Sequence, residues 1–282
     1  MLYKIKALEI NCTASNGGTF NKYQLINTEI KKVVSASAFK PELIDPKCNR
    51  IGNTVEVDLI TKGSFTNIST MSLVHEGIYK LQDSHTNTLF QQLMGKLEEL
   101  EEDEEVKQEA SFAKDLLIEN KEKFITWPAA KSNHHNFGGG LLMHTFEVAD
   151  HIWKYEEEHK LAAIAAIIHD VGKIHEYIFD PETGSIEMNT AWIEMNLSHT
   201  FWMTAMLNSE GFYALQNMIA SHHKCTEWGA LRDIESRNTP NVKDEEWILH
   251  LSDMWSARAG INSIEKLEKI YTEEGSYYYE TK

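Results

Sequence analysis

The first eighty residues alternate hydrophobic and polar positions over short stretches. The segment VEVDLI has a period of two, and IKKVVSASAF is rich in β-branched residues, as is typical of half-buried strands. The pattern predicts strands at 3–11, 20–27, 30–38, 54–61 and 65–74. Five strands in so short a segment suggest a small barrel, for which the OB-fold, often an oligonucleotide binder, is a candidate. A barrel that binds no nucleic acid and only packs against the adjacent domain would show the same pattern.

Beyond Ser84 the hydrophobic period becomes helical. Two apolar stripes flank the run Glu98–Glu105, which holds seven acidic residues, so we expect an acidic helical linker over 81–124. Residues 161–168 are apolar all round and predict a buried helix, which Gly172 would end in a left-handed conformation. Further helices are expected at 141–152, 197–208, 212–221, 244–259 and 261–271. The tail 275–282 suggests no role.

These patterns predict an α+β multidomain fold. An OB-like five-stranded β-barrel would occupy residues 1–80 and bind nucleic acid. The acidic linker over 81–124 would follow, and an all-α domain would occupy 125–282. No internal repeat is apparent.

Charge is distributed unevenly between these regions. The first 80 residues carry ten basic and seven acidic side chains, a net charge of +3, whereas the remainder carries 17 basic and 36 acidic, a net charge of −19. Nucleic acid is bound through Lys and Arg, so the overall charge of −16 would argue against such a partner unless the barrel provides the contacts.

The cysteines and the apolar segments indicate the cellular compartment in which the protein is expected. Cys12, Cys48 and Cys225 form no CxxC pair, which argues against a disulfide framework or a thiolate zinc site. We find no export signal and no apolar run of membrane-spanning length. A reducing cytoplasm, without a membrane partner, is therefore expected.

Histidine is concentrated in the helical region, where eleven of the thirteen lie between His134 and His250. Several interrupt apolar helices, and burying them is costly unless they are paired or ligate a metal. The candidates are His144, His169, Asp170, His199, His222, His223 and Asp253. Nitrogen and oxygen ligands without thiolates suit first-row divalent ions. Seven ligands fit two ions that share a carboxylate, an arrangement that serves phosphoryl transfer.

The same residues carry a family resemblance. His144, HDVGK at 169–173 and the distant Asp253 resemble the HD-domain superfamily of metal-dependent phosphohydrolases. In addition, WPAAKSNHHNFGGGLLMHT, HDVGKIHE, LSHT, ASHHKCTEWG and ILHLSDMWSAR resemble the YhaM-type 3′-to-5′ exoribonucleases, which join an OB-fold to an HD domain. The resemblance covers residues 127–258 in sequence and residues 1–80 only in architecture.

The resemblance implies a ligand set and a reaction. One ion would be held by His144, His169, Asp170 and Asp253, and the other by Asp170, His199, His222 and His223. Asp170 would bridge two divalent ions, with Mn²⁺ the first choice and Fe, Co, Ni or Zn as alternatives. A hydroxide between them would be the nucleophile. Lys173 would donate to a nonbridging phosphate oxygen as charge develops.

Other side chains are candidates for supporting roles. We expect His134 and His135 to contact substrate phosphate or to support the ligands, and Trp228 to contact a base. Glu176 and His151 are expected to orient ligands. Gly138–Gly140 would let the backbone pass close to the metals. The remaining assignments are His159, His175 and His250 as packing or surface residues, and Lys4, Lys6, Lys22, Lys31, Lys32, Tyr3, Tyr23 and Phe65 as barrel contacts.

The expected function is therefore metal-dependent 3′-to-5′ exonuclease activity on single-stranded RNA or DNA. The family's tendency to oligomerise also suggests a homo-oligomer. Two alternatives remain open. HD domains also serve dNTPases and cyclic-nucleotide phosphodiesterases, so a nucleotide phosphohydrolase is one. A non-catalytic nucleic-acid-binding adaptor is the other.

Overall fold

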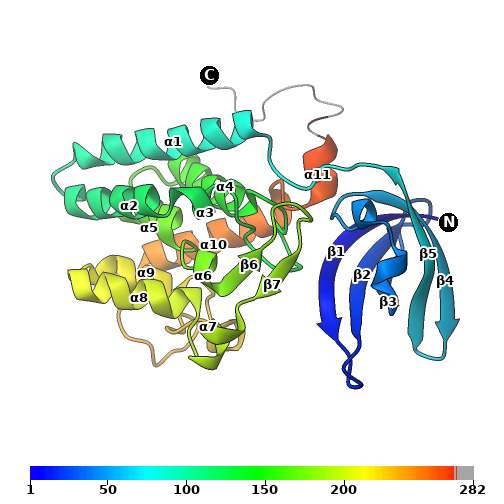
Figure 1. The fold of residues 1–282 in the computed structure, drawn as a ribbon. Helices are drawn as coiled ribbons and strands as arrows, with labels where there is room; N and C mark the ends of the chain where they lie inside the picture. The colour runs from blue at the N-terminus through cyan, green and yellow to red at the C-terminus, as the bar shows by residue number, and fades with distance from the viewer. Residues whose placement is uncertain (270, 272–282) are drawn as a thin grey trace.

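The computed structural model describes residues 1–269 and 271, which form a β-barrel beside a larger helical body (Figure 1). The barrel strands are β1 (Leu2–Thr13), β2 (Thr19–Asn27), β3 (Val33–Ala38), β4 (Thr54–Lys62) and β5 (Phe65–His75). Their order is β1-β2-β3-β5-β4, with β4 pairing back onto β1 and a parallel contact between β3 and β5. The prediction of a closed five-stranded barrel followed by a helical domain is confirmed.

The barrel closes around alternate side chains of its strands. Ile5, Leu25 and Val55 are fully buried inside it, as the period of two requires. Strand β3 begins three residues later than predicted, at Val33. The reason is a turn in which the Asn27 side chain accepts hydrogen bonds from the next backbone amides and Lys31 has a φ of +54°. Two short 3₁₀ helices, η1 (Pro41–Leu43) and η2 (Pro46–Cys48), connect β3 to β4.

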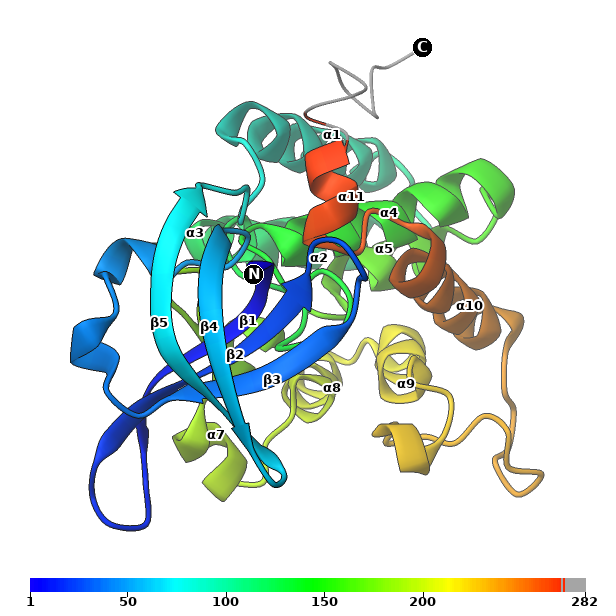
Figure 2. The same cartoon turned by 90° about the vertical axis from the view of Figure 1, so that its right-hand side faces the viewer.

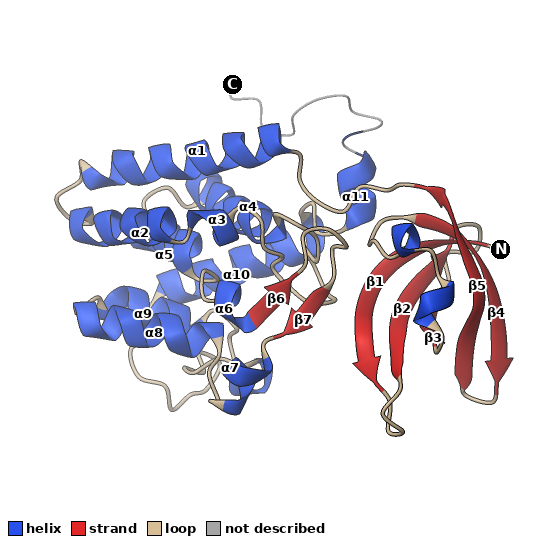
Figure 3. Cartoon of the chain, in the orientation of Figure 1, coloured by secondary structure: helices blue, strands red, loops and turns tan. Residues whose placement is uncertain are grey.

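The helical body, whose helices are drawn in blue in Figure 3, is built around one apolar helix. Its helices are α1 (Asp83–Glu101), α2 (Lys107–Glu119), α3 (Lys121–Phe124), α4 (Gly140–Tyr155), α5 (Lys160–Ile168), α6 (Lys173–Glu176), α7 (Thr190–Glu194), α8 (His199–Glu210), α9 (Tyr213–Ser221), α10 (Asp244–Ala259) and α11 (Ile264–Lys269). The 3₁₀ turn η3 (Thr226–Trp228) and the hairpin of β6 (Tyr177–Phe179) and β7 (Ile186–Met188) complete it. Helix α5 packs against α2, α4, α9 and α10, which explains why its sequence is apolar on every side.

Residues 81–124 form α1, α2 and α3 rather than an extended connection. Leu93 and Leu97 of α1 and Leu117 of α2 are fully buried, and both helices pack against the body through α4 and α5. The acidic run lies around the exposed turn between α1 and α2, where Asp103 pairs with Lys160. The segment expected to be a linker is thus packed onto the helical body, and the domain boundaries themselves stay predictions.

The barrel docks on the β6–β7 hairpin of the helical body (Figure 1), and the view turned by 90° shows the barrel in front of that body (Figure 2). The Ile51 amide donates to the carbonyl of Thr183 at 2.9 Å, and the Ser185 hydroxyl donates to the carbonyl of Leu8 at 3.1 Å. A salt bridge of 3.3 Å between Lys131 and Glu9 adds a charged contact. These bonds fix the barrel against the body.

Three remaining expectations concern the barrel surface, the chain end and the membrane. Tyr3 and Tyr23, expected as nucleic-acid contacts, are instead buried in the barrel, whereas Phe65 is exposed. Helix α11 covers only part of the predicted 261–271, and the tail 275–282 lies outside the described residues. Among the residues that the structure describes, no helix is long and apolar enough to cross a membrane.

Candidate metal centre

Seven side chains from five helix regions of the body meet at one point. His144 lies in α4, His169 and Asp170 follow the end of α5, and His199 begins α8. His222 and His223 follow α9, and Asp253 lies in α10. All are buried except His223, which is partly buried. The structure therefore brings together every candidate ligand that the sequence suggests.

Asp170 lies at the centre, with a different group of imidazoles at each carboxylate oxygen. Its Oδ2 is 3.3 Å from His144 Nε2 and 3.4 Å from His169 Nε2. Its Oδ1 is 3.4 Å from His199 Nε2 and 3.9 Å from His222 Nε2. Asp253 joins the first group, with Oδ1 at 3.1 Å from His144 Nε2. A carboxylate with a separate donor group at each oxygen has the arrangement of a bridging ligand.

Hydrogen bonds at Nδ1 fix the orientation of four of these imidazoles. The Nδ1 acceptors are Ser256 Oγ for His144 at 3.0 Å, Ala166 O for His169 at 2.7 Å, Glu176 Oε2 for His199 at 2.6 Å and Ile219 O for His222 at 2.7 Å. When Nδ1 carries the proton, Nε2 keeps a lone pair for a metal. All four Nε2 atoms face Asp170.

Several polar atoms of the centre are buried without a partner. Among the described residues, Asp170 Oδ1, His199 Nε2, His222 Nε2 and His223 Nδ1 have no hydrogen bond. A buried polar group without a partner costs about 1–3 kcal/mol, so four in one place need a common cause. A cation in contact with all of them would remove the cost. Nitrogen and oxygen donors without thiolates fit a first-row divalent metal.

The electrostatics of the centre also favour cations. Burial alone would raise the pKa of Asp170, but Lys173 and His169 hold it well below its usual value. Burial opposes a proton on His144, yet hydrogen bonds to Asp170 and Asp253 raise its pKa to about 9. By contrast, burial and the neighbouring His199 lower the pKa of His223 to about 4. The His223 imidazole is therefore neutral and available as a ligand near pH 7.

Lys173 is part of the centre, not a solvated helix residue. It is 7% exposed, and its Nζ lies 2.6 Å from Asp170 Oδ2. Burial would lower its pKa, but Asp170 raises it, so the ammonium stays charged. The same side chain lines the pocket above the centre.

The pocket above the centre has a volume of about 190 Å³ and opens beside η3. Its lining residues are His134, Lys173, His222, His223, Trp228, His250, Asp253, Met254 and Ala257. Trp228 is 54% exposed, and Lys224 Nζ lies over its ring at 5.0 Å from the centroid, so part of the indole remains accessible beside a positive charge. His250, expected to be a packing residue, also lines the pocket, and its Nδ1 donates to the carbonyl of His222 at 2.8 Å.

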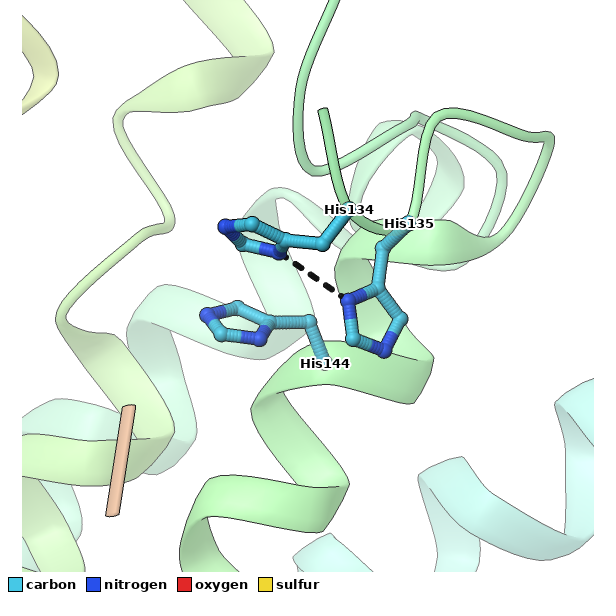
Figure 4. A group of neighbouring side chains, drawn as sticks. All are labelled: His134, His135 and His144. Carbon is cyan, nitrogen blue, oxygen red and sulfur yellow. Dashed lines mark hydrogen bonds between the residues drawn. The ribbon is translucent and has the colours of Figure 1, made fainter. Parts of the chain in front are cut away.

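The adjacent His134 and His135 have different environments (Figure 4). Their Nδ1 atoms lie 3.1 Å apart, and both rings are near His144. His134 is partly buried and lines the pocket, and burial lowers its pKa to about 2. His135 has no exposed surface, and its Nε2 lies 3.1 Å from Glu147 Oε2. Of the two roles expected for His135, its complete burial favours support of His144 over contact with substrate.

Glu147 and Ser256 form a support for His144 that the sequence analysis did not identify. Glu147 accepts hydrogen bonds from Ser256 Oγ at 2.6 Å and from the amide of Ile261 at 2.6 Å. Ser256 in turn accepts from His144 Nδ1. Close packing helps to hold the carboxylate, because a Cβ on Gly260 would lie 1.9 Å from Glu147 Oε2. The available signal was an acidic residue in the apolar segment GLLMHTFEV, one turn after His144.

Glu176 and His151, both expected to orient ligands, behave differently. Glu176 accepts from His199 Nδ1 at 2.6 Å, as expected. His151 contacts no candidate ligand. It lies 3.1 Å from Ser252 Oγ, with its ring against Trp255, because two helical turns separate it from His144.

The glycines near the centre allow close backbone approach. Gly172 has a φ of −59°, which corrects the expectation of a left-handed helix end. It is required because a Cβ there would lie 2.8 Å from His199 Cα. Gly140 leaves room for the backbone of His135, because a Cβ on Gly140 would lie 2.1 Å from the carbonyl oxygen of His135. The glycine loop therefore approaches the backbone of His135 rather than the ligands themselves.

Comparison with known proteins identifies the helical body. Residues 141–260 match the HD domain family. The 3′-5′ exoribonuclease YhaM of Geobacillus sp. strain WCH70 is 29% identical over 187 residues, which cover 58% of this chain and 54% of the relative. For YhaM of Bacillus licheniformis the identity is 33% over 180 residues, with 56% and 52% covered. For Bacillus subtilis it is 28% over 189 residues, with 58% and 55% covered.

Residues 141–260 therefore form an HD domain, and the chain is distantly related to the YhaM 3′-5′ exoribonucleases. It spans about half the length of the curated relatives that it matches. No solved structure matches it significantly.

Proposed function

We propose that this protein is a metal-dependent 3′-to-5′ exonuclease that hydrolyses phosphodiester bonds of single-stranded RNA or DNA. The observation that carries the proposal is the set of four buried, unpartnered ligand atoms around Asp170. The HD domain supports phosphohydrolase chemistry, and the distant YhaM relatives support a nucleic-acid substrate.

The metal ligands divide into two sets that share Asp170. His144, His169 and Asp253 would complete the set at Oδ2, and His199, His222 and His223 the set at Oδ1. Two divalent ions would supply an activated water and positive charge for the phosphate. Imidazole and carboxylate ligands without thiolate fit Mn²⁺, Fe, Co, Ni or Zn, and Mn²⁺ is the ion to test first.

The protein's own residues bind and orient the substrate in this proposal. Lys173 lines the pocket and keeps its charge, so it donates to a nonbridging phosphate oxygen as negative charge develops. His134, neutral and at the pocket wall, donates one further hydrogen bond. Trp228 stacks on the terminal base, because its ring is exposed at the pocket mouth. The barrel holds the remainder of the strand, as its position beside the body allows.

The test is degradation of 5′-labelled single-stranded oligonucleotides, RNA and DNA side by side, with Mn²⁺ and then with EDTA. We expect a ladder of products that shortens from the 3′ end, lost on chelation. Asp170→Asn removes the shared carboxylate charge and should abolish turnover while the protein stays folded. Asp150→Asn, which removes a partly buried carboxylate on α4 that pairs with Lys154, is the matched control.

Other outcomes would overturn the proposal. Hydrolysis of dNTPs or cyclic nucleotides without cleavage of oligonucleotides would show a nucleotide phosphohydrolase. Binding of oligonucleotides without cleavage under any of the metals would indicate a non-catalytic adaptor. Full activity of Asp170→Asn would contradict the proposal that Asp170 is a ligand shared by both metal ions.

A further inference from the structure

A second pocket lies between the barrel and the helical body, next to the metal centre. It has a volume of about 250 Å³. Its lining includes Lys4 and Lys6 of β1, and His134, Asn136, Ala257 and Glu265 of the body. His134 and Ala257 also line the pocket above the metal centre, so the two pockets adjoin along these residues.

Asn136 offers this pocket an unused hydrogen-bond donor. The residue is only 3% exposed, and its Nδ2 has no hydrogen-bond partner among the described residues. A buried amide normally has a partner, because leaving it without one costs free energy. Since Asn136 lines the pocket, an oxygen atom of a molecule in the pocket could accept this bond.

The barrel side of the pocket contributes positive charge. Lys4 and Lys6 both line it, whereas Glu265 is the one acidic residue of the lining. The pairing of β1 with β2 shifts register between Ile5 and Ala7, so Lys6 lies in a bulge. Bulges re-aim side chains at the edges of sheets and barrels. Two ammonium groups facing an otherwise acidic helical body fit an anionic ligand, of which a phosphate is the simplest.

We propose that this pocket binds the nucleotide on the 5′ side of the scissile linkage, with Asn136 and Lys6 donating to its phosphate. The inference rests on the proposed exonuclease function and names a substrate subsite for it. His134 stands between the two pockets. A strand held by the barrel would therefore pass through the interdomain pocket first and present its 3′-terminal nucleotide to the metals and Trp228.

The test compares a long and a short substrate. Bis(4-nitrophenyl) phosphate is a small diester that needs only the metal centre, whereas an oligonucleotide also needs the interdomain pocket. We expect Lys6→Gln to lower kcat/KM for the oligonucleotide about tenfold relative to the small diester, as loss of one charged hydrogen bond predicts. Asn136→Asp, which replaces the donor by a negative acceptor, should lower the same ratio at least as much.

Binding at several salt concentrations gives a second readout. For an oligonucleotide with phosphorothioate linkages at its 3′ end, the slope of log Kd against log salt should fall by about 0.7 when one phosphate contact is lost. Lys6→Gln should show this change. The matched controls are Lys47→Gln on η2 and Asn238→Asp in an exposed loop, which lie outside both pockets and should keep the wild-type ratio and slope.

The outcomes separate this inference from the proposed function. An unchanged ratio and slope in Lys6→Gln, with active wild-type protein, would overturn the subsite and leave the exonuclease standing. A wild type that hydrolyses only the small diester would refute the exonuclease. In that case the slope of log Kd against log salt would be the remaining test of the pocket as a phosphate-binding site. Equal slopes for wild type and Lys6→Gln would reject that site. Lys6 is only partly buried, whereas Asn136 is 3% exposed, so the Lys6 variant stays informative if Asn136→Asp does not fold.

Discussion

Replacing Ser256 by alanine tests whether the support behind His144 sets metal affinity. The Ser256 hydroxyl donates to Glu147 Oε2 at 2.6 Å and accepts from His144 Nδ1 at 3.0 Å. All three side chains are essentially inaccessible, so water cannot replace the hydroxyl without rearrangement. The change removes one hydroxyl, leaves the α10 backbone intact and leaves both its partners buried.

The structure sets the expected magnitudes. His144 Nδ1 loses Ser256 Oγ as its acceptor, whereas Glu147 keeps the Ile261 amide and His135, so one buried group is left without a partner. We expect the free energy of unfolding of the metal-free protein to fall by about 1–3 kcal/mol. Loss of an outer contact that orients a metal-bound imidazole typically lowers metal affinity about 10–100-fold. At about 1.4 kcal/mol per factor of ten, this is about 1.4–2.8 kcal/mol of binding free energy.

The same helix provides a matched control. Ser252 lies one turn before Ser256, is 1% exposed and pairs with His151 at 3.1 Å, but His151 contacts no candidate ligand. Urea unfolding in EDTA should show similar losses of stability for Ser252→Ala and Ser256→Ala. Calorimetric titration with Mn²⁺ should show weaker binding only for Ser256→Ala. Equal Mn²⁺ affinities for Ser256→Ala and wild type, or an equal loss in both variants, would refute the reasoning.

Three further predictions follow from the geometry of the centre. Because hydrogen bonds raise the pKa of His144 to about 9, this group is protonated at pH 7, and metal binding should release about one proton per molecule from it. Calorimetry in buffers of different ionisation enthalpy measures the number of protons released. The release should disappear above pH 9. Zero release at pH 7 would contradict the prediction. Mn²⁺ at about 100 times its Kd should raise the free energy of unfolding by about 2.7 kcal/mol. The melting temperature should rise accordingly, and EDTA should reverse the rise. Asp170→Asn should show no such rise. Gly172→Ala should cost about 1–3 kcal/mol of stability through overpacking against His199, whereas Gly95→Ala, with open space around its Cβ, should be neutral or stabilising in the same unfolding assay.

The sequence by itself determined the five barrel strands, most of the long helices and the chemistry of the candidate ligands, but not the β6–β7 hairpin. A period of two specifies which strand residues face the barrel interior, and an apolar segment such as 161–168 must be buried wherever it packs. Imidazoles and carboxylates inside apolar helices need a common partner, so the seven candidate ligands could be named without coordinates. These inferences need no coordinates because they depend on local periodicity and on the cost of burying charge.

Tertiary structure decided the relations between distant residues. His134 and His135 are neighbours in sequence, yet one lines a pocket and the other is fully buried, because His135 has a φ of +54° and turns toward Glu147. Glu147 and Ser256 meet across 109 positions through the packing of α4 on α10. The interdomain pocket exists only because the barrel docks beside Asn136. Periodicity encodes the face of a helix, but which faces meet is fixed by packing of the whole chain.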